Sequence, residues 1–176
     1  MTRSVPSVSV TYAQNGGSTK SNEFGMRPMQ ERAYEKRGEQ YLLIKSPPAS
    51  GKSRALMFVA LDIVVPEKSI GSSFYDEPLT KFGFWADWHV EPKWNLCNAP
   101  GSEGGKVNSV KAFLDSGDQV LVCTHATFRF AVDRFGVQAF DDRLIAVDEF
   151  HHVSANPDNK LGAHLAEFIA RDKVHI

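Results

Sequence analysis

The sequence predicts an α/β fold, in which helices flank a central and mostly parallel sheet. Three apolar runs support this prediction, at residues 41–44, 119–123 and 143–147. Each has the length and composition of a strand that is buried on both faces, and stretches with helical periodicity separate them. With 176 residues, of which 42% are hydrophobic and 23% charged, the chain is long enough to form one such domain around its own core.

The first 22 residues differ from the rest, because they are rich in Ser, Thr, Gly and Val and contain no acidic residue. They predict a flexible N-terminal arm, followed by one domain over residues 23–176. Pro28 and Gly38 fit the start and the stop of a helix over 28–37. Its Gln30 carries an amide donor and acceptor that could read an adenine edge. A solvated helix glutamine is the alternative.

The stretch that follows the run at 41–44 reads SPPASGKS over residues 46–53 and leads into an apolar helical stretch. A strand, a loop of small residues ending in Gly-Lys-Ser, and a helix are the setting of a phosphate-binding loop, whose backbone N–H groups turn toward phosphate oxygens. Lys52 is then expected to reach the β- and γ-phosphates of ATP, and the Ser53 hydroxyl to ligate Mg²⁺. The expected nucleotide contacts are Ser46, Ala49, Ser50, Gly51, Lys52 and Ser53.

Two residues of this loop depart from the strict pattern, because Ser46 and Ala49 stand where glycine is frequent. Neither departure forbids the loop. The alternative interpretation is an ordinary strand, turn and helix with a capping serine and an exposed lysine.

The run at 143–147 ends in two adjacent carboxylates, Asp148 and Glu149. An ATPase needs one carboxylate near its phosphate loop to hold hydrated Mg²⁺ and a second to orient or deprotonate the attacking water. We assign the first role to Asp148 and the second to Glu149. Because Lys52 and Asp148 must serve the same magnesium–phosphate unit, the strand at 41–44 is expected to lie directly beside the strand at 143–147.

Two further stretches allow either binding or packing. Ser69 and Ser72 follow the apolar residues 63–65 and could hydrogen-bond a nucleic-acid backbone, although capping of a following helix explains them equally well. Aromatic residues crowd residues 82–94, where stacking on bases competes with the more frequent role of fastening a long loop to its own domain.

The overall composition sets limits on the class of protein. A formal net charge of −1 carries no general signal for nucleic-acid binding, so any such contact must be local. Two cysteines are too few for a disulfide framework and suit a reducing, cytoplasmic environment. No apolar stretch approaches the ~20 residues of a membrane span.

Taken in order, these motifs resemble the first RecA-like domain of superfamily-two helicases and translocases, the DEAD/DEAH-box group, and are most similar to DExH ATPases of the type III restriction-subunit kind. Residues 27–30 look like the adenine-reading element, 46–53 like motif I, 65–74 like motif Ia, 122–125 like a nucleic-acid backbone motif, and 148–151 like motif II in its DExH form. The resemblance favours adenine contact by Gln30. It also implies that Thr124 contacts nucleic acid and that His151 couples the nucleotide site to the motor.

The resemblance implies a RecA-like lobe, truncated before motif III, whose partner is a second RecA-like domain that supplies an arginine finger. The expected function is ATP hydrolysis coupled to movement on nucleic acid, DNA rather than RNA, with Lys52, Asp148, Glu149 and His151 at the chemistry. Two alternatives stay open. A small-molecule kinase would use the same loop, and a non-catalytic binding module would carry the motifs without a working site.

Overall fold

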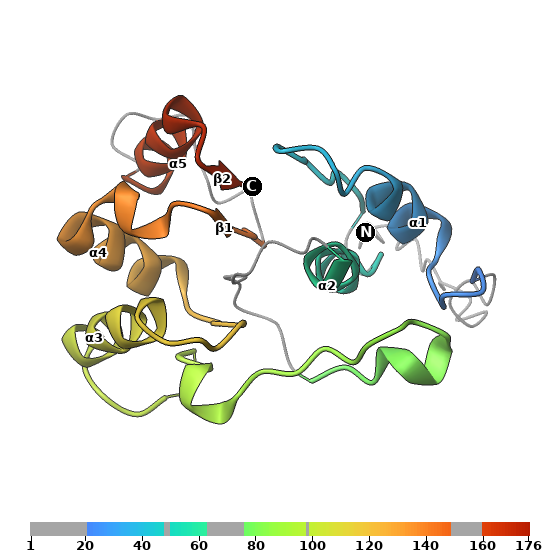
Figure 1. Ribbon diagram of the computed structural model, residues 1–176, viewed down its shortest axis with the longest axis horizontal. Helices are drawn as coiled ribbons and strands as arrows, with labels where there is room; N and C mark the ends of the chain where they lie inside the picture. The colour runs from blue at the N-terminus through green and yellow to red at the C-terminus, as the bar shows by residue number, and fades with distance from the viewer. Residues whose placement is uncertain (1–20, 48–49, 63–75, 98, 149–159) are drawn as a thin grey trace, which may run out of the picture.

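A computed structural model describes residues 21–47, 50–62, 76–97, 99–148 and 160–176 of the chain. The fold is rich in helices and contains a small parallel sheet (Figure 1). The α-helices are α1 (Pro28–Glu35), α2 (Lys52–Asp62), α3 (Glu103–Leu114), α4 (His125–Phe135) and α5 (Lys160–Arg171). Short 3-10 helices are η1 (Leu79–Phe82), η2 (Pro92–Trp94) and η3 (Val137–Phe140). None of the helices in these ranges combines the length and apolar character that a membrane crossing requires.

The sheet is formed by β1 (Arg143–Leu144) and β2 (Val174–His175), which pair in parallel with Arg143 opposite Val174. On the other side of β2, Leu42 N–H donates to the Ile176 carbonyl at 2.7 Å, and Ile176 N–H donates to the Gln40 carbonyl at 2.9 Å. This is the bonding pattern of a parallel pair. The segment before the phosphate loop therefore lies next to β2, and β2 lies between it and β1.

The prediction that the strand before the loop lies directly beside the strand before Asp148 is wrong. Nucleotide chemistry requires only that the loops at the ends of these strands converge. One intervening strand separates its neighbours by about 9–10 Å, a distance that the first turn of α2 and the residues after β1 span. Residues of β2 in turn provide backbone hydrogen bonds on both sides.

The run at 41–44 is also less buried than predicted. Leu43 is 70% exposed and Tyr41 39% exposed. Backbone hydrogen bonds tie this segment to Ile176, and the Tyr41 hydroxyl donates to Asp172 Oδ1 at 2.8 Å. Residues 41–44 line an apolar cavity of about 640 Å³, together with residues of α2, the sheet and α5. Within the part of the chain that the structure describes, the backbone hydrogen bonds of this segment lie on one side only.

With the described residues, the predicted strand at 119–123 forms one parallel bridge, between Val122 and Asn95. Val122 N–H donates to the Trp94 carbonyl at 2.9 Å, and Leu96 N–H donates to the Val122 carbonyl at 2.7 Å. All three residues from Leu121 to Cys123 are buried, as predicted. Because successive side chains of an extended segment point to opposite sides, Leu121 and Cys123 enter one apolar cluster and Val122 enters another.

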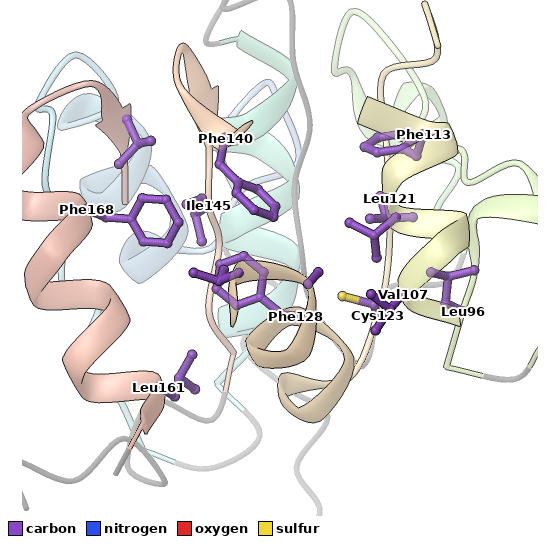
Figure 2. Packing of buried hydrophobic residues seen from close by; sticks show 14 of the residues in the cluster. Leu96, Val107, Phe113, Leu121, Cys123, Phe128, Phe140, Ile145, Leu161 and Phe168 are labelled. Carbon is purple, nitrogen blue, oxygen red and sulfur yellow. The ribbon is translucent and has the colours of Figure 1, made fainter. Parts of the chain in front are cut away.

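The larger cluster packs α3, α4 and α5 around the sheet, and Figure 2 shows its aromatic centre. The Phe128 ring meets Phe140 edge-on at 5.4 Å between centroids and stacks on Phe168 at 6.0 Å. Such pairs stabilise beyond the area they bury, by about 0.5–1.5 kcal/mol each. This cluster holds β1, and with it the start of the Asp148 segment, in a rigid frame.

The second cluster packs α1 and α2 against the aromatic segment. Its buried members are Met26, Met57, Phe58, Leu79, Phe84, Trp88, Val90 and Val122. The packing interpretation of the aromatic segment is confirmed at three positions, since Phe84, Trp88 and Trp94 are all less than one-tenth exposed. Phe82 and Trp85 lie at the surface, at 49% and 61% exposed.

Candidate nucleotide site

The phosphate loop leads directly into α2, whose first residue is Lys52. Gly51 precedes it with a φ of +89°, a conformation that L side chains rarely adopt. The Lys52 ammonium donates to the carbonyls of Ser46, at 3.3 Å, and Pro47, at 3.2 Å. Ser46 Oγ donates to Ser50 Oγ at 2.7 Å. The loop thus closes on itself around the lysine, and Ala49 lies outside the described residues.

Ser53 and Asp148 meet although 95 residues separate them in the chain. Ser53 Oγ donates to Asp148 Oδ2 at 2.7 Å, and Asp148 is only 5% exposed. The first turn of α2 positions the hydroxyl, and the extended segment after β1 positions the carboxylate. One hydroxyl and one carboxylate are hard oxygen ligands of the kind that Mg²⁺ takes from a protein while it keeps several waters. The donor set fits that ion.

Gln30 supports the loop from α1. It is 1% exposed, its Oε1 accepts from Arg27 N–H at 2.8 Å, and its Nε2 donates to the Gly51 carbonyl at 3.1 Å. A Cβ atom added at Gly51 would lie 2.7 Å from that Nε2, which is closer than real Cβ contacts. The amide therefore connects α1 with the backbone at the tightest point of the loop. Contact of Gln30 with adenine stays a prediction.

Helix α1 is in turn fixed to the far end of α2. Arg37 donates from Nε to the Asp62 carboxylate, and its guanidinium lies 4.2 Å from the centroid of the Tyr34 ring. Partial burial, and then the nearby Asp62 carboxylate, raise the pKa of the Tyr34 hydroxyl, while the bond to Asp62 raises the pKa of Arg37. The guanidinium and hydroxyl thus keep their protons around Asp62, and α1 and α2 form one unit that carries the loop.

Thr124 caps α4. Its Oγ1 accepts from Thr127 N–H at 3.1 Å and lies 3.0 Å from Thr127 Oγ1, and Thr127 Oγ1 donates to Glu103 Oε2 at 2.9 Å. Capping accounts for this threonine, and its contact with nucleic acid stays a prediction. Four other predicted site residues, Ser69, Ser72, Glu149 and His151, lie outside the described residues.

The sequence did not predict the contact that His125 makes, although the stretch 122–125 resembles a nucleic-acid backbone motif. The Nε2 atom of His125 lies 3.0 Å from the backbone carbonyl oxygen of Asp148. One signal in the sequence could have found it. His125 comes two residues after the predicted strand at 119–123, and Asp148 comes directly after the strand at 143–147. Residues that follow parallel strands converge at one sheet edge.

Comparison with known proteins yields one informative similarity. The chain is 49% identical, over 180 aligned positions, to a protein of Bacillus subtilis (strain 168) that carries the name Putative ATP-dependent helicase YeeB. The similarity covers 96% of this chain and 30% of that protein's length. No family model matches the chain, and no solved structure matches it. A helicase-type ATPase is therefore the kind of protein to which this chain is similar.

Proposed function

We propose that the chain is the ATP-binding lobe of a nucleic-acid-dependent ATPase, with the RecA-like P-loop fold and DExH motif that its sequence resembles. The contact between Ser53 and Asp148 carries this proposal, because it brings together two predicted magnesium ligands that lie 95 residues apart in the chain. Similarity to a protein named as an ATP-dependent helicase supports it independently.

In the proposed site, Lys52 binds the β- and γ-phosphates of ATP as a point charge. It now donates to two loop carbonyls, so phosphate oxygens must replace these acceptors when ATP binds. The loop amides at Ser50 and Gly51, with Ser46 and Ala49 before them, cradle the phosphates. Gln30 supports the loop through its hydrogen bond to the Gly51 carbonyl, and it is the candidate residue for recognition of the adenine edge.

Ser53 and Asp148 would hold Mg²⁺, which neutralises charge that develops on the transferred phosphoryl group. Glu149 is proposed to orient and deprotonate the attacking water, and His151 to couple the site to nucleic acid. Ser69, Ser72 and Thr124 are the proposed contacts with a nucleic-acid backbone, DNA rather than RNA. A second RecA-like domain is the proposed source of an arginine finger, so hydrolysis by this lobe alone is expected to be slower by roughly 10³–10⁵.

The experiment that tests this function is the melting temperature of the purified chain with and without millimolar ATP and Mg²⁺. Ligand at about 100 times its dissociation constant adds about 2.7 kcal/mol, which raises the melting temperature of a domain of this size by roughly 5–10 °C. Lys52→Ala should abolish the rise. Lys111→Ala is the matched control, because Lys111 pairs with Asp115 on the surface of α3 and should leave the rise intact. No rise in the wild-type chain would favour a non-catalytic module.

A further inference from the structure

The contact between His125 and Asp148 is not part of the nucleotide site that the sequence predicts. A carbonyl oxygen only accepts hydrogen bonds, so the 3.0 Å contact requires a proton on His125 Nε2. The accepting oxygen belongs to Asp148 itself, whose carboxylate accepts from Ser53 at 2.7 Å. Asp148 is therefore held at both its backbone and its side chain, by two different helices.

The histidine is well placed to fix this backbone, because its own position is rigid. It is the first residue of α4, and the residues on either side are tied down. Before it, Cys123 is fully buried and Thr124 caps the helix. After it, Thr127 is fully buried and donates to Glu103 at the start of α3. The ring therefore projects from a turn that two helices hold in place.

Orientation of the Asp148 peptide matters for a magnesium ligand. The carbonyl and the carboxylate of Asp148 are both attached through its Cα, so a shift of the backbone at this residue would move the carboxylate away from Ser53. A loss of outer-shell support of this kind typically lowers metal affinity by about 10–100-fold. We propose that His125 is a positioning residue, which holds the Asp148 peptide so that its carboxylate stays in register with Ser53 and Lys52 for magnesium-bound nucleotide. This inference rests on the proposed function.

The test is calorimetric titration of the full chain with ATP, once in EDTA and once in excess Mg²⁺. The ratio of the two dissociation constants is the magnesium gain in ATP affinity. His125→Ala should reduce this gain about tenfold and leave the dissociation constant in EDTA within twofold of the wild type. His125→Gln places an amide donor the same number of bonds from Cα, and it should retain most of the gain.

Two controls separate positioning from general damage. His125→Phe keeps a ring without a donor and should behave like His125→Ala, so it decides the matter if the alanine variant fails to fold. His164→Ala removes another imidazole contact, the one at 2.9 Å to Asp133 in α4, and should keep the full gain. A full gain in His125→Phe, or an equal loss in His164→Ala, would overturn the role of His125.

Failure of the proposed function has a different signature in the same titrations. A wild-type chain without any magnesium gain would refute the magnesium–nucleotide site, and this role for His125 with it. A wild-type gain that survives removal of the His125 donor would refute the positioning role alone.

Discussion

The two halves of the molecule are stabilised in different ways. The half built from α3, α4 and α5 has a core of stacked and edge-on aromatic rings around Phe128. The half that carries the phosphate loop has an apolar cluster of its own around Phe58 and Phe84, and side-chain polar contacts also connect its segments, among them those of Gln30 with Gly51 and of Arg37 with Asp62. In Figure 1, α1 and α2 lie on one side of the sheet strands and α3 to α5 on the other.

The candidate site forms where the two halves meet. The half built from α3, α4 and α5 supplies Asp148 and His125, and the half that carries the phosphate loop supplies Lys52 and Ser53. A ligand that contacts both halves should therefore stabilise the whole domain. Substitutions in the two halves should affect ligand binding differently, because each half supplies different residues of the site.

The largest expected effect is on the aromatic half. Phe128→Ala removes a ring that is 2% exposed and contacts two others, and it should lower the free energy of unfolding by about 3–5 kcal/mol. Phe130→Ala is the matched control on the same helix, since Phe130 is 41% exposed. Urea denaturation of both variants measures the difference. Similar losses in the two would contradict the aromatic core.

A smaller and more local effect is expected at Gln30. Gln30→Ala leaves the Arg27 N–H and the Gly51 carbonyl without this amide, which should cost about 1–3 kcal/mol and disorder the loop. If the amide acts mainly through the loop, affinities for ATP, GTP and tripolyphosphate fall together, by about tenfold. Gln138→Ala, a surface change in η3, is the control. A loss confined to ATP would assign Gln30 to adenine recognition instead.

The smallest expected effect is a dependence of stability on pH in the half that carries the phosphate loop. Asp76 accepts from Val90 N–H at 2.9 Å and from the His89 ring at 2.8 Å. The backbone bond, followed by His89, lowers the pKa of Asp76 below its ordinary value of 3.8. A lowered folded-state pKa stabilises the fold above the unfolded-state pKa, and this stabilisation is lost as pH falls through the folded-state pKa.

Asp76→Asn should therefore flatten the acid side of the curve of stability against pH, below about pH 4. The effect should be small because the Asp76 side chain is 61% exposed. Urea denaturation between pH 2 and pH 6 measures it, beside Asp115→Asn at the C-terminal cap of α3 as the control. An unchanged acid limb in Asp76→Asn would contradict the pairing with Val90 and His89.

The helices were largely predictable from local signals. Helical periodicity between the apolar runs indicated the regions that form α3 and α4, and Pro28 marked the first residue of α1 as the structure has it. The strand order was not predictable in the same way, because the insertion of β2 between two other segments depends on pairing of residues more than 130 positions apart. Leu43 is 70% exposed, and among the described residues its segment forms backbone hydrogen bonds on one side only.

The residues of the candidate site likewise divide into those that local sequence signals predict and those that depend on long-range packing. Loop chemistry identified Lys52 and Ser53, and the end of an apolar run identified Asp148, because each signal lies within a few residues. The contacts of Gln30 with Gly51 and of His125 with Asp148 join residues 21 and 23 positions apart. They depend on the packing of whole helices, which sequence periodicity does not specify.

The most direct test of a site formed between the two halves is a double-mutant cycle on Ser53 and Asp148, read as the magnesium gain in ATP affinity. Ser53→Ala and Asp148→Asn should each reduce the gain about tenfold or more, and the double variant should lose little more than the more affected single variant, because both side chains serve one ion. Independent, additive losses would show that the two residues act at separate places, and would contradict the site.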